Sequence, residues 1–492
     1  ISYWVSLNPI RITVLLLLFN ASIVQAGFLV EDHSLTASDA TEHDKFGSSI
    51  AISGDTAVIG APDNDDSGTD MGSAYVFIRS ESGWIEQAKL VAPDATEETN
   101  DGVKFGASVA ISGDTAVVGA YHSNQSGAVY VFVRSGTDWI EQAKLVGSDT
   151  AAWDAFGYSV AISGDTIAVG TLGSVAAYVF TRNESNWTEQ AKLTASDAAT
   201  DNLFGANLAI SEDTIVVGAA LTSSEAGDRS GSAYVYKQHG SEWSQQAKLT
   251  ASDAAAYDHF GDSVDISGNI IVVGASWDDE LFEDSGSVYV FSREEDVWEE
   301  QSKLLDPDPA REASFGESLA LTEDALVVGN DVYQHNGDTW RHRASVRPSD
   351  SKSWGMGSSK SPVDLSTSTV IVGATNSQGA GIRSGSAYIF DLDCNAEKHN
   401  LPPNQWHQIS LPCNPDPNNT LAAVFGDDIP GTYGTDWMLY KDAGVSKELL
   451  DEGDSLLPAA AYWIIQRSSE DMILGIPDGS TKTPVTISDS CH

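Results

Sequence analysis

The chain has 492 residues, with 71 acidic residues against 26 Lys and Arg, and a formal charge of −45 at pH 7. A protein this negative repels the phosphate groups of nucleic acids and anionic membranes, so we expect neither as a partner. Hydrophobic residues make up 41% of the chain, which is enough for a folded core and excludes general disorder.

The first 26 residues predict a secretory signal peptide. Arg11 precedes an apolar run over residues 12–19, and Ala26 ends a small-residue pattern typical of signal-peptidase cleavage. The run is far shorter than the roughly 20 residues that a membrane-spanning helix needs. We therefore expect an exported protein that is secreted, periplasmic or held at the cell surface, with no integral membrane segment once residues 1–26 are removed.

A repeat of about 50 residues fills most of the remaining chain. Its marker is an aromatic residue followed by Gly, which recurs at Phe46-Gly47, Phe105-Gly106, Phe156-Gly157, Phe204-Gly205, Phe260-Gly261, Phe315-Gly316 and, in a degenerate form, Trp354-Gly355. The recurrence predicts an array of similar units packed side by side.

Each unit predicts four short strands. In the first unit, residues 49–52 and 57–60 are alternating runs joined by a Gly-Asp turn, residues 72–77 predict a third strand, and residues 84–90 predict a fourth that begins at Trp84. Seven such units without a helix signal predict an all-β fold, a seven-bladed β-propeller of four-stranded blades.

The seventh unit lacks a fourth strand after it, and the N-terminus supplies a candidate. Residues 34–39 repeat the Leu-Thr-Ala-Ser-Asp sequence found at 193–197 and 249–253. We therefore predict that residues 27–36 form the outer strand of the seventh blade. This N-terminal outer strand would close the ring and remove its exposed edges.

The repeats resemble the FG-GAP repeats of integrin-α-type propellers, in the form found in secreted bacterial proteins. The resemblance spans residues 34–392 and depends on the Phe-Gly pairs, on Gly60-Ala61-Pro62 and on Gly-Ser-Ala-Tyr-Val-Phe strands such as 72–77. It implies an extracellular binding scaffold without naming a ligand. Integrin-type repeats often carry an Asp-rich calcium loop between the first two strands; here a four-residue turn stands there, so we expect that particular site to be absent from every blade.

The predicted domains are a signal peptide over 1–26, the propeller over 27–393 and a small β-rich module over 394–492. The module contains Trp406, Trp437 and Trp463, which we interpret as core residues, with a carbohydrate- or surface-binding role as the alternative. Its three cysteines leave open one disulfide or three free thiols; a disulfide would join Cys413 to Cys394 or to Cys491.

Most repeated residues have a structural interpretation. The Phe, Tyr and Trp of every unit suit packing between blades, and the Gly residues suit tight turns. The ten His are scattered without a zinc or hydrolase motif. Because active sites break repeats, and no unusual acid, base or nucleophile is evident in only one or two units, we expect no catalytic residue and a protein that is not an enzyme.

Acidic residues gather in the loops that enter each first strand and in those that join the second and third strands. Alternating strand directions place both sets on one face of the ring, here called the loop face, while Arg79, Arg134, Arg182 and Arg293 lie by the opposite face. We interpret single entry-loop residues such as Asp197 and Asp253 as turn caps.

Two acidic loops are candidate Ca²⁺ sites, because calcium takes six to eight oxygen ligands. The candidate metal ligands are Asp63, Asp65, Asp66 and Asp70 in the first unit, and Asp278, Asp279, Glu280 and Asp284, next to Glu283, in the fifth. The alternative is that these acids cap turns and keep the protein soluble.

Together these features predict an exported, non-enzymatic binding or adhesion scaffold. We expect it to recognise an extracellular protein or polysaccharide through the loop face of blades one, four, five and seven, where the loops between second and third strands are longest. The alternatives are a hydrolase or lyase with its site in the central depression, and a structural spacer of a surface protein.

Overall fold

The computed structural model describes residues 27–392, except 67, 81–82, 95–101, 198–201, 310–312, 338, 348–360 and 378–380, together with six short strands between residues 399 and 474. The predicted signal peptide, Trp354-Gly355 and the three cysteines lie outside the described residues.

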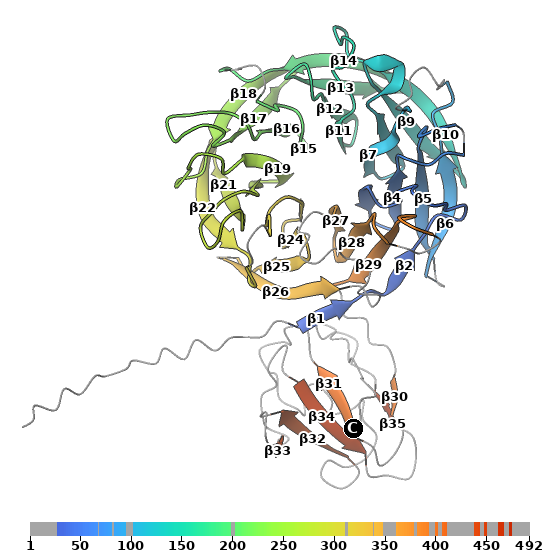
Figure 1. Cartoon of the computed structure of the whole chain (residues 1–492), viewed down its shortest axis with the longest axis vertical. Coiled ribbons are helices and arrows are strands. Elements are labelled where there is room, and N and C mark those ends of the chain that lie inside the picture. Colours follow the sequence, from blue (N-terminus) through green and yellow to red (C-terminus); the bar gives the residue numbers. More distant parts are fainter. Residues whose placement is uncertain are drawn as a thin grey trace, which may run out of the picture.

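Seven antiparallel sheets form a ring around a central channel (Figure 1), which confirms the predicted propeller. In each blade the strands are given from the channel outward. Blade one contains β3 (Ser49–Ser53), β4 (Thr56–Ala61), β5 (Ser73–Ser80) and β6 (Gly83–Leu90), and blade two contains β7 (Phe105–Ser112), β8 (Thr115–Ala120), β9 (Ala128–Ser135) and β10 (Asp138–Leu145). Blade three contains β11 (Ser159–Ser163), β12 (Thr166–Gly170), β13 (Ala177–Asn183) and β14 (Asn186–Leu193). Blade four contains β15 (Leu208–Ser211), β16 (Thr214–Ala219), β17 (Ser232–His239) and β18 (Glu242–Leu249). Blade five contains β19 (Phe260–Ser267), β20 (Ile270–Ala275), β21 (Ser287–Glu294) and β22 (Val297–Leu305).

The last two blades both use N-terminal residues. Blade six contains β23 (Leu319–Leu321), β24 (Ala325–Val328), β25 (Asp331–His335) and β26 (Trp340–Arg347), and blade seven contains β27 (Val363–Ser366), β28 (Thr369–Ala374) and β29 (Ser386–Asp391). The strand β2 (His33–Leu35) pairs antiparallel with β29, so an N-terminal outer strand closes the ring as predicted. The prediction was wrong for residues 27–30, because β1 (Gly27–Val30) pairs parallel with β26 and adds a fifth strand to blade six.

The Phe-Gly marker forms the joint between neighbouring blades. The amide of Phe105 donates to the Met71 carbonyl of blade one, and its ring packs edge-to-face on Tyr130 and Phe132 of its own blade, with centroids 5.5 and 6.1 Å apart. Gly72 has φ of 80°, and a Cβ there would overlap the Phe105 carbonyl, so only Gly allows this approach. Phe46 bridges to Gly385 of blade seven in the same way, which makes the ring-closing joint equivalent to the others.

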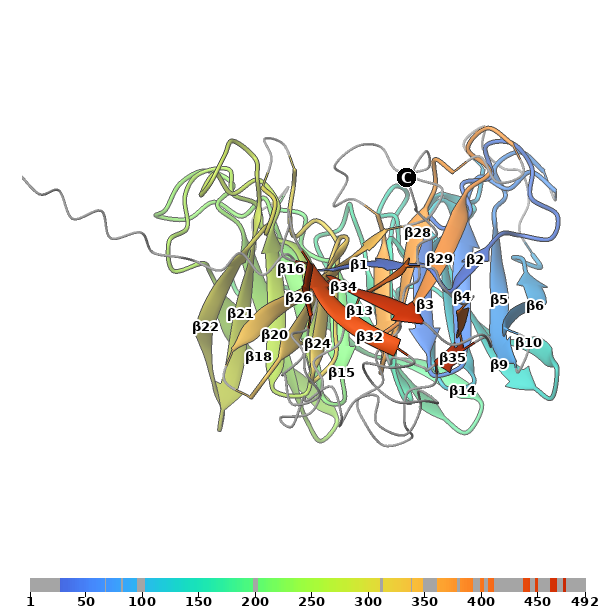
Figure 2. The same ribbon diagram turned by 90° about the horizontal axis from the view of Figure 1, so that it is seen from below.

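The strands run between two faces of the ring whose connecting loops differ in length, and Figure 2 shows the ring from the side. On one face, two-residue turns such as Gly54-Asp55 join first and second strands. The opposite face carries the longer loops, including residues 62–72 and 276–286 and the 3₁₀ turn η1 (Ser123–Gln125), the one helical element among the described residues. Repeated Phe and Tyr side chains such as Phe105 and Tyr130 are fully buried, which confirms their core role.

Beyond the ring, the described strands of the C-terminal region form two sheets. One has the order β31 (Trp406–Ser410), β34 (Ala461–Gln466), β32 (Trp437–Asp442) and β33 (Lys447–Leu449). The other pairs β30 (His399–Leu401) with β35 (Met472–Leu474).

Candidate functional site

Five blades share an Asp–Tyr–Lys clamp at the loop face. In blade four, Asp197 accepts hydrogen bonds from the Tyr234 hydroxyl at 2.8 Å and from the Lys248 ammonium at 2.5 Å. The same arrangement recurs as Asp39, Tyr75 and Lys89; Asp94, Tyr130 and Lys144; Asp149, Tyr178 and Lys192; and Asp253, Tyr289 and Lys303. Asp197 and Asp253 therefore do more than cap turns, since each ties the start of its repeat to the third and fourth strands of the same blade.

The clamps also set the charge of the loop face. Burial opposes ionisation of Asp253, but hydrogen bonds from Lys303 and Tyr289 outweigh it and lower the pKa of this carboxyl. Burial likewise opposes the charge of Lys303, yet contacts with Asp253, Asp278 and Glu280 raise its pKa. Both groups are therefore charged at neutral pH, and the repeated Lys compensates part of the acidity that the sequence places on this face.

The candidate calcium ligands of blade one are engaged by Lys side chains. Asp63 contacts Lys45 at 2.6 Å and Lys104 at 2.8 Å, and Lys104 also contacts Asp70 at 2.9 Å. Two further candidates have other partners: Asp66 contacts the Lys89 ammonium at 2.5 Å, and Asp65 accepts the Asp70 amide at 2.7 Å.

The blade-five candidates have a similar set of partners. The Lys303 ammonium lies 3.0 Å from Asp278 and 3.1 Å from Glu280, and Asp278 also accepts the Tyr289 hydroxyl at 3.0 Å. Asp279 accepts the amide of Asp284 at 2.8 Å.

This arrangement does not fit a metal as it stands. Among the described residues, no group of three or more His, Cys, Asp or Glu side chains is placed to hold a metal ion. Calcium at either loop would have to displace a Lys ammonium, which already neutralises the carboxylates. Calcium binding therefore stays a prediction.

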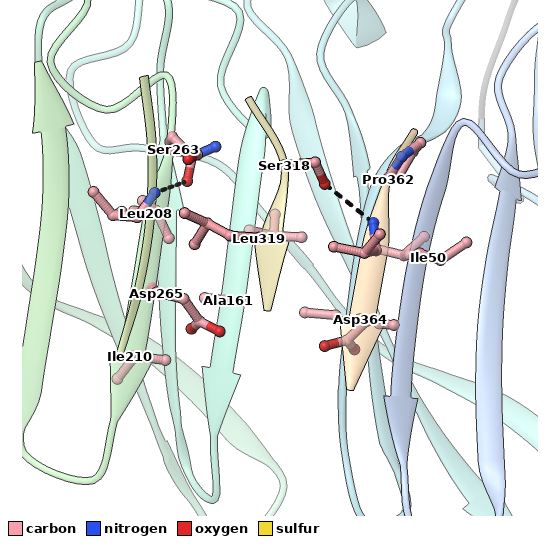
Figure 3. Close-up of a pocket in the computed structure, with 18 of the residues that line it drawn as sticks. Ile50, Ala161, Leu208, Ile210, Ser263, Asp265, Ser318, Leu319, Pro362 and Asp364 are labelled. Carbon is pink, nitrogen blue, oxygen red and sulfur yellow. Dashed lines mark hydrogen bonds between the residues drawn. The ribbon is translucent and has the colours of Figure 1, made fainter. Parts of the chain in front are cut away.

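The central channel contains two carboxylates that the sequence interpretation missed. Its cavity of about 350 Å³ is lined by the first strands of the blades, mostly by Ala, Val, Ile and Leu. Asp265 on β19 and Asp364 on β27 also line it (Figure 3). Aligned units carry Ala at this position in the other five blades, namely Ala51, Ala110, Ala161, Ala209 and Ala320.

Each channel carboxylate joins two blades. Asp265 accepts the Leu321 amide of blade six at 2.7 Å, and Asp364 accepts the Ile52 amide of blade one at 2.6 Å. Burial raises the pKa of Asp265 to about 7, with a further contribution from the charge of Asp364. Burial also raises the pKa of Asp364 to about 6.

The expectation that no unusual acid breaks the repeat was therefore wrong. Position-by-position alignment of the first strands would have found both residues, because Asp replaces Ala in only two blades. What the alignment does not give is their common location, since the closure of the ring brings them into one cavity.

A second departure from the repeat lies in blade six, with Asp331, His342 and Ser345. The His342 Nε2 lies 2.8 Å from Asp331 Oδ1 and 3.5 Å from Ser345 Oγ, and Ser345 also donates to Asp331 at 2.6 Å. In a Ser–His–Asp triad the acid and the nucleophile contact opposite ring nitrogens. Here both contact the same nitrogen, so this cluster is not a triad.

The ring of seven four-stranded blades, with its longer loops on one face, defines a seven-bladed β-propeller. Its repeat matches a family model described as the FG-GAP repeat over residues 29–77, 84–132, 139–180, 187–236, 243–291 and 298–350. These matches cover more than half of the chain, so the chain belongs to the FG-GAP repeat family, and this fold supports a binding or scaffold role.

Two solved structures match parts of the chain at low sequence identity. A candidate 6-phosphogluconolactonase from Bacteroides uniformis is 12% identical, with 60% of this chain and 83% of that chain covered and a TM-score of 0.42. Sqt1 from Saccharomyces cerevisiae is 11% identical, with 74% and 99% covered and a TM-score of 0.40. No curated protein matches the sequence. Within the described part of the chain, no helix has the length and apolar character needed to cross a membrane.

Proposed function

We propose that the protein is an exported binding or adhesion scaffold that recognises an extracellular protein or polysaccharide through its loop face. The observation that carries this proposal is the asymmetry of the ring. Long loops with acidic and exposed aromatic side chains occupy one face, whereas the other face consists of short turns. Export is supported by the signal-peptide pattern of residues 1–26.

The test is saturable binding of the purified chain to arrays of extracellular proteins and glycans. Asp279→Asn with Glu283→Gln removes two charges from the loop face, and the Asn oxygen still accepts the Asp284 amide. As a matched control, Asp55→Asn with Asp114→Asn removes two charges from turns on the opposite face, where Asp55 lies 3.8 Å from Arg79 and Asp114 lies 3.4 Å from Arg134. We expect the first pair to weaken binding and the second to leave it unchanged.

The reverse order would contradict recognition through the loop face. Absence of binding to every probe would instead favour a structural spacer.

A second candidate is a hydrolase or lyase with its site in the channel. The observation that favours it is the pair Asp265 and Asp364, because acids with raised pKa values in a cavity suit proton transfer. The test is whether the wild type turns over a polysaccharide or an ester and whether Asp265→Ala and Asp364→Ala lose this activity. That result would favour the enzyme over the non-enzymatic scaffold as the function of the protein.

A further inference from the structure

Two joined loops of blade five carry four exposed apolar side chains. Tyr257 belongs to the entry loop, and Trp277, Leu281 and Phe282 belong to the loop between β20 and β21; their exposures are 51, 47, 43 and 51%. The two loops are joined, because the Trp277 amide donates to the Asp258 carbonyl at 3.3 Å. We call these four residues the blade-five patch. Several exposed apolar side chains on adjoining loops favour an interaction site.

The fold of the loop does not require these side chains. The corresponding loop of blade one has the same length and the same internal bond, since Asp65 accepts the Asp70 amide just as Asp279 accepts the Asp284 amide. At the positions of Trp277, Leu281 and Phe282, blade one carries Asp63, Ser67 and Gly68. Because blade one forms the same loop without apolar residues at these three positions, a contact outside the loop would explain them in blade five.

The surroundings of the patch are acidic. Asp279, Glu280, Glu283 and Asp284 belong to the same loop as Trp277. The entry loop in turn contacts the loop of blade four that carries Glu225, Asp228 and Arg229, where the Tyr257 amide donates to the Asp228 carbonyl at 2.8 Å. A cationic ligand complements this charge, and a neutral glycan does not.

Elsewhere in the ring, repeated aromatic side chains are paired with cations. Arg lies over Trp in four blades and Lys over Tyr in five, with 4.9 to 5.4 Å from the charged group to the ring centroid. No such pair involves Tyr257 or Trp277 among the residues that the structure describes. The rings of the patch are thus available for a cation from a ligand.

A buried group beneath the patch also lacks a partner. The His259 ring packs against the Trp277 indole with centroids 4.5 Å apart, and its side chain is 8% exposed. Within the described part of the chain, its Nε2 has no hydrogen-bond partner. Burial lowers the pKa of this imidazole, so it is neutral at pH 7. A ligand that displaced the side chains covering this nitrogen would supply the missing bond.

We propose that the blade-five patch binds a basic peptide segment, with Lys or Arg side chains over Tyr257 and Trp277 and the neighbouring carboxylates around them. The proposal rests on the proposed function of the loop face and specifies its partner. Aromatic side chains dominate the binding energy of many interfaces, so a few residues suffice for a measurable effect.

The probe is a fluorescent nine-residue peptide of alternating Lys and Gly, titrated with the full chain at low salt and followed by anisotropy. Trp277→Ser and Phe282→Ser are the test variants. Trp153→Ser is the matched control, because Trp153 is an exposed Trp on the entry loop of blade three, at 69% against 47% for Trp277. We expect about tenfold weaker binding for Trp277→Ser and no change for Trp153→Ser, with unaltered melting curves for both.

Several results would overturn the inference. The first is that Trp277→Ser binds the Lys-Gly peptide as tightly as the wild type does. The second is that a Ser-Gly peptide binds the wild type as tightly as the Lys-Gly peptide does. The others are that cellohexaose displaces the Lys-Gly peptide, or that the Lys-Gly peptide does not bind at all. A loss with Trp153→Ser instead of Trp277→Ser would place the ligand elsewhere on the loop face, so the proposed function would stand while this inference fails. If neither the peptide nor any array probe binds, both the proposed function and this inference fail.

Discussion

The channel carboxylate Asp265 should make the ring less stable as pH rises, and replacing it by Ala should remove that effect. Ala is the residue at the same position in five other blades, so the fold accommodates it. Among the described residues that line the channel, Asp265, Asp364 and Glu317 are acidic and none is Lys, Arg or His. Ionisation of Asp265 therefore finds no compensating charge there.

The sign follows from the direction of the pKa shift. The pKa of Asp265 rises to about 7 on folding, so its stabilising contribution is complete below the unfolded value of about 3.9 and is lost as pH rises through about 7. Between pH 5 and pH 8 this linkage costs the wild type about 2.5 kcal/mol. For Asp364, with a pKa of about 6, the corresponding loss is about 1.4 kcal/mol.

The assay is urea unfolding of wild type, Asp265→Ala and Asp364→Ala at several pH values between 5 and 8. Loss of the hydrogen bond from the Leu321 amide lowers the unfolding free energy of Asp265→Ala by the same amount at every pH. The informative quantity is therefore how the difference in unfolding free energy between variant and wild type changes with pH. We expect Asp265→Ala to gain stability relative to wild type toward pH 8, and Asp364→Ala to gain about half as much. Parallel curves for all three proteins would refute the reasoning.

Three further predictions follow from the ring itself. Deleting residues 27–36 removes β1 and β2, with buried Leu35, and should lower the melting temperature by about 10 °C; an unchanged transition would show that these strands do not stabilise the closed ring. Phe105→Ala should cost about 3 to 5 kcal/mol in urea unfolding, because Phe105 is fully buried at the joint between blades one and two, and a loss below 1 kcal/mol would contradict that role. Calorimetry in millimolar calcium tests the two acidic loops: because Lys104 and Lys303 already neutralise their carboxylates, neither a heat of binding nor a raised melting temperature is expected, and the appearance of both would establish the calcium sites.

Local patterns predicted the blades well, because each strand is specified by a few neighbouring residues. The Gly-Asp turn at Gly54-Asp55 and the Trp that begins the fourth strand at Trp84 both fall within one residue of the observed strand ends. The Phe-Gly joint was also predictable, since its aromatic side chains recur at fixed positions in every unit.

Predictions that depended on pairing between distant segments were less complete. The match of residues 34–39 to other outer strands located β2, yet the sequence contains no match that assigns residues 27–30 to blade six. A parallel edge pairing such as β1 with β26 leaves no turn or hairpin signal. The contacts of Lys303 also could not be predicted from local patterns, because Lys303 lies 50 residues along the chain from Asp253.

Departures from the repeat carry the functional information in this ring. Equivalent positions in different blades lie at the same depth and height, so a change of residue type at one position has a defined location. Asp265 in an Ala position places a carboxylate in the channel, and Trp277 in the position of Asp63 places an indole on the loop face. Neither residue is needed for the strands to form, since other blades form without it. The repeat therefore separates the residues that build the propeller from those that its ligands would contact, and experiments on binding should begin with the latter.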